Sequence, residues 1–332
     1  MIVAITGATG FVGSHIADEL HRRGHRVRCL LRPTSNVRWI EGKPYERHLC
    51  SFDDTDSLKL AISGSDAVVH VAGVIAARSL AEFMDGNLGV TKRMLEATAQ
   101  VAGSSFVRFL HVSSMAVCGP ARSLEEPLDE DSPLEPITPY GISKKAAEEA
   151  VSAMSSTLPT TIVRPPAVYG ERDEATLSFF RAVAAGIVPL IGFSPKWVSL
   201  VHVRDLARGI VDALESNATV GRTYFVSSDE FYTWKQIGMC TAAIMRCRAI
   251  PVVIPHWVVL SIAAISGWIG HLRGRAPVLD FHKGRDLIQR YWICSTDRAR
   301  NDFGYRQNVP LDEGIADTVE WYVSQGWIRQ RR

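Results

Sequence analysis

Three closely spaced glycines near the start of the chain, Gly7, Gly10 and Gly13, constrain its fold more than any other feature. They follow a short apolar run, Met1 to Ile5, and precede a helical pattern that begins at Ser14. Glycine is needed where the backbone turns with positive φ or approaches another group closely. The amides and the dipole at the start of the next helix attract an anion such as a pyrophosphate. We therefore expect a strand, a tight turn and a helix that bind a dinucleotide.

Strand and helix patterns alternate through the first half of the chain. Strands are expected near residues 2–6, 26–31, 46–50, 66–71, 106–112 and 159–164, and another near 222–226. Alternation of this kind predicts a parallel sheet covered on both faces. We expect an α/β protein: a Rossmann-type, doubly wound parallel sheet with a smaller, discontinuous C-terminal substrate domain. The dinucleotide domain should comprise residues 1–170, with 198–228 returning to it, and the substrate domain 171–197 and 229–332.

The composition excludes several classes of protein. With 332 residues, 46% of them hydrophobic, the chain can build full cores, so disorder is excluded. A formal charge of +2 gives no strong field that would attract nucleic acid. The six cysteines include no Cys-x-x-Cys pair, so we expect no metal site and reduced thiols. The core strand begins at Ile2 without a preceding signal-like segment, and we expect a cytoplasmic protein.

An apolar stretch at residues 252–270 allows three interpretations. It is nearly long enough to cross a bilayer but contains Pro255 and His256. A packed helix that lines the substrate pocket is preferred, contact with a membrane surface is second, and a true span is third. The side chains that would line an apolar pocket, or equally a core, are Trp257, Val258, Ile262, Ile265, Trp268 and Ile269.

A Tyr-x-x-x-Lys unit, Tyr140 and Lys144, lies at the start of a predicted helix. Four residues are about one helical turn, so both side chains lie on one face. A nearby ammonium group is expected to lower the pKa of the tyrosine and make it a proton donor or acceptor. Ser114 follows the expected strand 106–112 at the same edge of the sheet as the glycine loop, where its hydroxyl could bind a substrate oxygen or cap a turn.

These elements, in this order, resemble the extended branch of the short-chain dehydrogenase/reductase superfamily, also described as the NAD-dependent epimerase/dehydratase family. Further matching segments span nearly the whole chain: His70–Gly73, Asn87 with Thr91, Arg164–Gly170 and Val201–Ala207. The segment Ser113–Pro120 resembles the 3β-hydroxysteroid dehydrogenase and dihydroflavonol reductase-like branch more than the sugar-nucleotide epimerases. The resemblance implies that Ser114 binds a carbonyl oxygen, Tyr140 transfers the proton and Lys144 holds the nicotinamide ribose.

The expected site residues fall into two groups. The catalytic group is Ser114, Tyr140, Lys144 and Asn87. The positions expected to contact the cofactor are Gly7, Thr9, Gly10, Phe11, Val12, Gly13, Arg32, Ser51, Phe52, Val71, Ala72, Gly73, Ser113, Tyr140, Lys144, Pro165, Pro166 and Val168. Ser51 occupies the place of an aspartate that contacts adenine in the family, so we expect adenine to rest on Phe52 instead.

The end of the second strand bears on the choice of cofactor. An NAD site needs an acidic residue about twenty positions after the glycines, and none is in reach here. Arg32 instead places a cation where a 2′-phosphate would lie, and Thr34 and Ser35 could add hydroxyl donors. The sequence therefore favours NADP, with NAD as the alternative, and NADP in turn suggests reduction.

The leading interpretation is an NADP(H)-dependent oxidoreductase that interconverts a ketone and a secondary alcohol on a fairly apolar small molecule. One alternative is a nucleotide-sugar epimerase or dehydratase with bound NAD, whose diphosphate could use Arg172, Lys196 and Arg204. Another is a non-catalytic, NADP-binding regulatory protein. By resemblance, helices near 81–102 and 139–157 would form the interface of a homodimer.

Overall fold

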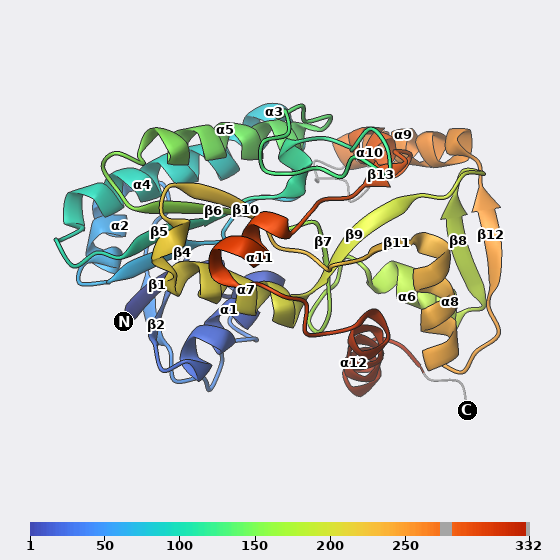
Figure 1. The fold of residues 1–332 in the computed structure, drawn as a ribbon, viewed down its shortest axis with the longest axis horizontal. Helices are drawn as coiled ribbons and strands as arrows, with labels where there is room; N and C mark the ends of the chain where they lie inside the picture. The colour runs from blue at the N-terminus through green and yellow to red at the C-terminus, as the bar shows by residue number, and fades with distance from the viewer. Residues whose placement is uncertain (273–280, 330–332) are drawn as a thin grey trace.

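The structure is a computed structural model that describes residues 1–272 and 281–329. Its larger part is a seven-stranded, all-parallel sheet with the strand order β10-β6-β5-β4-β1-β2-β3 (Figure 1). The strands are β1 (Ile2–Thr6), β2 (Arg26–Leu31), β3 (Glu46–Leu49), β4 (Ala67–His70), β5 (Arg108–Val112), β6 (Thr160–Arg164) and β10 (Arg222–Phe225). These bounds agree closely with the expected strands, and the Rossmann-type, doubly wound α/β fold is confirmed.

Helices cover both faces of this sheet because alternate side chains of each buried strand point to opposite faces. One face packs against α1 (Phe11–Arg22) and α7 (Val203–Glu215), and its core includes Ile16, Leu20 and Ile210. The other face packs against α2 (Thr55–Ile62), α4 (Val90–Val101) and α5 (Pro139–Ala153). The helix α11 (Asp297–Phe303) packs beside β10. Before α4, the chain forms α3 (Leu80–Met84) and a π-helical turn, Asp85–Gly89.

The smaller part contains two small sheets. In one, β9 (Trp197–His202) pairs with β7 (Ala167–Tyr169), β11 (Phe231–Thr233) and β13 (Tyr291–Trp292). In the other, β8 (Ile187–Ile191) pairs with β12 (Ile250–Ile254). The helices here are α6 (Leu177–Ala184), α8 (Trp234–Ile244), α9 (His256–Leu272), α10 (Phe281–Leu287) and α12 (Leu311–Ser324).

Residues 198–228 are divided between the two parts. The helix α7 packs on the larger sheet, and strand β10 pairs with β6 at its edge. The strand β9, in contrast, lies at the centre of the smaller sheet and pairs with none of the seven parallel strands. It therefore links the two parts, because α7 continues directly from its last residue, His202.

Candidate active site

The glycine loop joins β1 to α1 at the carboxyl edge of the sheet. Gly7 has φ +74°, and a Cβ on it would lie 2.9 Å from the amide nitrogen of Ala72. A Cβ on Gly13 would lie 2.1 Å from the carbonyl oxygen of Gly7. Gly10 begins α1 without a side-chain cap, and no acidic residue lies in the first helical turn. The amides of this turn, including those of Phe11 and Val12, are thus left for an anion, which fits a dinucleotide pyrophosphate.

The chain after β4 lies against this loop. The Thr6 hydroxyl oxygen accepts hydrogen bonds from the amides of Val71 (3.1 Å) and Ala72 (3.0 Å). Gly73 is exposed beyond them, and a Cβ there would lie 2.9 Å from Oδ1 of Asn87 and 4.0 Å from Nζ of Lys144. The structure therefore brings the expected segment Val71–Gly73 between the glycine loop and the helix that carries Lys144.

Tyr140 meets Ser114 because of how α5 begins. Thr138 caps the helix by accepting from the amide of Gly141 (3.1 Å), and Pro139 occupies the first turn. Gly141 lies so close to the chain after β5 that a Cβ would be 2.4 Å from the carbonyl oxygen of Ala116. This contact holds the first turn of α5 against the Ser114 segment, so that the Ser114 hydroxyl lies near the phenol of Tyr140 and lowers its pKa. Two hydroxyls placed in this way can donate hydrogen bonds to a carbonyl oxygen.

Ser114 also has a structural role. Its hydroxyl caps the short 3₁₀ turn Met115–Val117 by accepting from the amide of Ala116 (3.2 Å). The two interpretations of Ser114, a turn cap and a substrate ligand, are therefore compatible. A hydroxyl oxygen has two lone pairs, so it can accept at the cap and still interact with Tyr140.

Lys144 is buried beneath this pair, one turn further along α5. Its ammonium group donates to the carbonyl oxygen of Val112 (2.8 Å) and lies 3.5 Å from Nε2 of His111. Burial lowers the pKa of Lys144 to about 8, and the carboxylate of Glu148 opposes this shift. A buried amine that is still largely protonated at neutral pH can position a sugar hydroxyl and supply positive charge.

The expected lowering of the Tyr140 pKa is wrong for the protein without cofactor. Burial raises the pKa of Tyr140 above its ordinary value, and the nearby Ser114 hydroxyl offsets this only in part. The ammonium of Lys144 points toward β5, where its hydrogen bond to Val112 is formed, and it does not counter the burial of the phenol. Tyr140 is therefore protonated at neutral pH, as a proton donor must be.

Asn87 lies in the π-helical turn and ties three segments together. Its Oδ1 accepts from the amide of Val74 (2.7 Å), and its Nδ2 donates to the carbonyl of Val74 (3.1 Å) and to Oγ of Ser143 (2.8 Å). Single π-helical turns are frequent at functional sites. Here the turn places the Asn87 side chain between α5 and the loop that begins at Gly73.

The chain after β6 supports the Ser114 segment from below. The carbonyl of Pro165 accepts from the amide of Met115 (2.9 Å), and Pro166 is buried beside it, with Val168 half-buried on β7. Ser113 is buried, and its hydroxyl has no hydrogen-bond partner among the residues that the structure describes. An unpaired buried hydroxyl at this edge is consistent with a ligand that completes the site.

The structure agrees only in part with the residues expected to contact adenine. Ser51 is exposed at the edge of the sheet, whereas the ring of Phe52 packs in the core with Leu58 and Leu95. Phe52 therefore has no free ring face on which adenine could rest, and its burial follows from packing that a linear pattern does not show. Its carbonyl instead accepts from Nε of Arg93 (2.6 Å), a residue on α4 that the sequence analysis did not select.

Two histidines lie behind the catalytic residues and were not expected. His70 is held by the hydroxyls of Thr6 (2.8 Å) and Thr91 (3.0 Å), and its ring centroid is 5.4 Å from that of His111. Burial, together with the charge of Lys144, lowers the pKa of His70 to about 3 and that of His111 well below its ordinary value. Both rings are neutral at pH 7, so Lys144 is the charged group of this cluster. A signal that could have found His70 is that it is the only titratable residue of β4, whereas β5 carries Arg108 as well as His111.

The apolar helix α9 does not line a pocket as expected. Trp257, Ile262, Ile265 and Trp268 are 70%, 52%, 58% and 66% exposed, and among the side chains of this helix that the structure describes, Val259 and Ala263 are buried on the opposite side. The Ile269 side chain lies outside the described residues. Over residues 1–272 and 281–329, no helix is long and apolar enough to cross a membrane.

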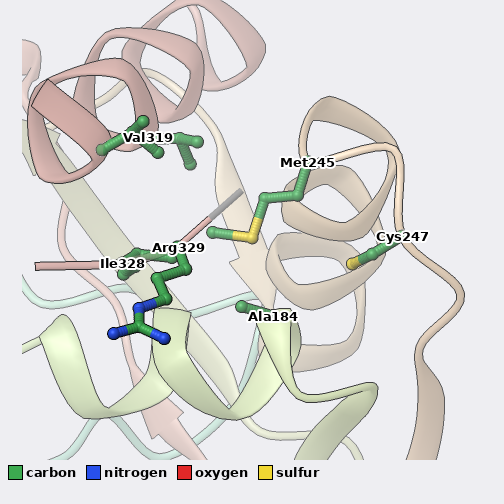
Figure 2. A pocket seen from close by; sticks show the side chains of 7 residues that line it. Ala184, Met245, Cys247, Val319, Ile328 and Arg329 are labelled. Atoms are coloured by element: carbon green, nitrogen blue, oxygen red, sulfur yellow. The ribbon is translucent and has the colours of Figure 1, made fainter. Parts of the chain in front are cut away.

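A small cavity in the substrate part does not supply the site either. Figure 2 shows a narrow gap lined by Met245 and Cys247 near α8, Val319 on α12 and Ala184 on α6. Its volume of about 10 Å³ holds no more than a single water molecule.

In the part of the chain that the structure describes, no three His, Cys, Asp or Glu side chains are arranged to hold a metal ion.

Known proteins agree with this geometry. The sequence profile of the NAD dependent epimerase/dehydratase family matches residues 3–235. A ceramide reductase of Caulobacter vibrioides (strain NA1000 / CB15N) is 30% identical over 331 residues, which cover 98% of this chain and 96% of that protein. A 4-hydroxy-2-methyl-3-oxo-4-farnesyl-3,4-dihydroquinoline-1-oxide ketoreductase of Stigmatella aurantiaca is 26% identical, with 94% and 93% covered.

A solved structure supports the fold. The UDP-glucose 4-epimerase of Thermotoga maritima superposes with a TM-score of 0.80 at 22% identity, over 98% of this chain and 99% of that one. At this identity the likeness concerns the fold alone. Taken with the family profile and the reductase relatives, it shows that this chain is an oxidoreductase of the extended short-chain dehydrogenase/reductase superfamily and belongs to the NAD-dependent epimerase/dehydratase family.

Proposed function

We propose that the protein is an NADP(H)-dependent ketone reductase, or the reverse alcohol dehydrogenase, for a fairly apolar small molecule. One observation carries the proposal: the first turn of α5 packs on the chain after β5, which places Tyr140 near Ser114 at the carboxyl edge of the sheet, with buried Lys144 one turn away. Open parallel sheets bind ligands at this edge.

The mechanism follows from these side chains. The substrate carbonyl oxygen accepts hydrogen bonds from the Ser114 and Tyr140 hydroxyls, which stabilise the negative charge that develops on it. A bound nicotinamide would supply the hydride to the carbonyl carbon. Tyr140 then gives its proton to the oxygen, for which its raised pKa keeps it in the protonated form. The ammonium of Lys144, one turn further along α5, would hold the nicotinamide ribose.

NADPH is the proposed cofactor because of Arg32. Its side chain is exposed just after β2, and no ion pair engages it among the residues that the structure describes. The backbone amide of Arg32 donates to Oγ of Ser35 (3.0 Å) in a tight turn. This bond uses only the backbone of Arg32, so the guanidinium is free to meet a 2′-phosphate. The six free cysteines agree with a reducing compartment, and we therefore place the enzyme in the cytoplasm.

The apolar substrate class rests on the relatives. One is named a ceramide reductase and another a ketoreductase of a farnesyl-bearing quinoline oxide. Both names describe reductases of molecules with a long apolar portion. We extend that substrate class, and not either compound, to this chain.

The epimerase alternative loses support because the basic side chains that would bind a diphosphate already have partners within the protein. Arg172 forms an ion pair with Asp18 (2.8 Å), and Arg204 forms one with Asp317. Lys196 donates to the backbone carbonyl of Ile288. A non-catalytic role is disfavoured because such a protein has no chemical need for Ser114, Tyr140 and Lys144 together.

The test is NADPH oxidation with a panel of apolar ketones, using the parent and the Tyr140→Phe variant. We expect the parent to consume NADPH and the variant to lose turnover while it still binds NADPH. Net NADPH consumption separates a reductase from an epimerase, which returns its hydride within each turnover. Unchanged turnover by Tyr140→Phe would exclude Tyr140 as the proton donor.

A further inference from the structure

The helix α9 exposes a broad apolar face that nothing in the described structure covers. Its 17 residues, His256–Leu272, include no Asp, Glu, Lys or Arg. The exposed side is defined here as the α9 face: Trp257, Ile262, Ile265 and Trp268. A surface helix of a globular protein carries charged or polar residues on its outward side, whereas the outward side of this helix is apolar.

The α9 face is extended by exposed aromatic residues of neighbouring segments. Phe193 follows the end of β8 and is 86% exposed, and its neighbour Gly192 packs against the ring of His256, beside Trp257. Phe281 at the start of α10 is also exposed, and α10 packs on α9 through Gly284, where a Cβ would lie 2.9 Å from that of Ala263. Figure 1 shows α9 and α10 together along the outer edge of the substrate part. Contiguous apolar surface of this kind marks an interaction site.

The charges around the α9 face indicate its partner. Residues 256–290 contain five Lys or Arg and two Asp, whereas the formal charge of the whole chain is only +2. Of the described basic residues, Arg285 on α10 and Arg290 just before β13 follow α9 in the chain, and both are exposed. One of the two acidic residues, Asp286, is already paired with Lys283. A second copy of this chain would bring two cationic rims together, which is unfavourable, whereas an anionic surface would be attracted.

We propose that the α9 face binds the surface of a lipid bilayer that contains anionic lipids. Tryptophan near both ends, branched aliphatic residues between them and a basic border are the features of a helix that lies in the membrane interface. The helix need not cross the bilayer, in agreement with its length. This inference goes beyond the proposed reaction, and its test does not depend on turnover.

The position of α9 connects this surface to the candidate active site. After α10, the chain enters β13, where the carbonyl of Tyr291 accepts from the amide of Ala121 (2.9 Å). Ala121 and Met115 belong to one buried cluster, and Met115 directly follows Ser114. The surface is thus joined to the Ser114 segment through α10, β13 and one buried cluster.

The experiment is co-sedimentation of the full chain with phosphatidylcholine vesicles, with and without phosphatidylglycerol. We expect binding to the anionic vesicles that weakens as salt is added, because screening reduces the attraction to the lipid surface. The variant Ile265→Asp should bind about tenfold more weakly, since a carboxylate would have to approach the acyl region. The matched control is Leu60→Asp, a 79% exposed aliphatic residue on α2 that should bind as the parent does.

A second readout locates the contact. Brominated lipids quench tryptophan that enters the interface, and we expect this quenching in the parent and its loss in the double variant Trp257→Phe, Trp268→Phe. Equal binding by Ile265→Asp and the parent, equal loss in Leu60→Asp, or no binding by the parent would overturn the proposal. So would a dimer in lipid-free sedimentation that Ile265→Asp dissociates, because the α9 face would then be a protein interface.

Discussion

Arg164 on β6 and Glu148 on α5 form a buried ion pair that fixes the helix of the catalytic residues to the sheet. Nη2 of Arg164 lies 2.7 Å from Oε2 of Glu148, Nε lies 3.0 Å from Oε1, and both side chains are almost fully buried. Glu148 stands one turn after Lys144 on the same helix. The pair therefore fixes the position of α5 relative to the sheet, and with it the positions of Tyr140 and Lys144.

Removal of one partner of this pair should destabilise the fold. Glu148→Ala leaves the Arg164 guanidinium buried without its carboxylate, and we expect the free energy of unfolding to fall by about 3 kcal/mol or more. Chemical denaturation measures this change. Glu149→Ala, an exposed residue next to it, is the control and should change stability little. Equal stability of the two variants would show that Arg164 finds another partner.

Lys144 should impose a limit on the pH range of the reaction. Its pKa of about 8 means that the ammonium is present below that pH and is lost as the pH rises through it. Because kcat/KM reports groups of the free enzyme, its value for the reduction should fall above about pH 8. A pH profile of parent and Lys145→Met should show the same fall, because Lys145 instead donates to the carbonyl of Leu134. A profile that stays flat to about pH 10, near the ordinary lysine pKa, would contradict this assignment.

The contribution of Lys144 to stability changes with pH in the opposite sense to its contribution to activity. A lysine whose pKa is lowered in the folded state carries a penalty at low pH, where it is protonated in both states. The unfolded chain binds more protons between about pH 8 and the ordinary lysine value, so the contribution of Lys144 to stability rises across that window. Lys144→Met removes this dependence and should abolish turnover. Thermal unfolding at several pH values, compared with the parent, measures the difference.

The homodimer expected by resemblance stays a prediction, and its interface would be a different surface from the α9 face. Helices α4 and α5 lie side by side, and Ala146 is half-buried on α5. We expect light scattering to give twice the mass of one chain and Ala146→Arg to reduce it to a single chain. Ile265→Asp on α9 should remain a dimer, which separates this interface from the α9 face. A monomeric parent at micromolar concentration would contradict the prediction.

The sequence predicted those parts of the site whose signal is local. Gly7, Gly10 and Gly13 define a turn through their own backbone freedom, and Tyr140 with Lys144 share a helix face through spacing alone. Glu148 could not be recognised, because its partner Arg164 meets it only after β6 joins the sheet. The burial of Phe52 and the place of β9 likewise depend on packing between distant segments. For α9, the apolar pattern is the same whether its face meets a pocket, a core or a membrane, so only the structure shows that Trp257 and Ile265 are exposed.

Arg32 should decide the preference between the two nicotinamide cofactors. A charged hydrogen bond to a 2′-phosphate contributes about 1.5–3 kcal/mol, so Arg32→Glu should lower kcat/KM for NADPH about tenfold to a hundredfold. The new carboxylate can accept from the ribose hydroxyls of NADH, and kcat/KM for NADH should fall less or rise. Arg22→Glu is the control: Arg22 is exposed at the C-terminal end of α1, at the opposite edge of the sheet, and should leave the preference unchanged. If Arg32→Glu alters both cofactors equally, Arg32 does not contact the 2′-phosphate, and NAD becomes the better assignment.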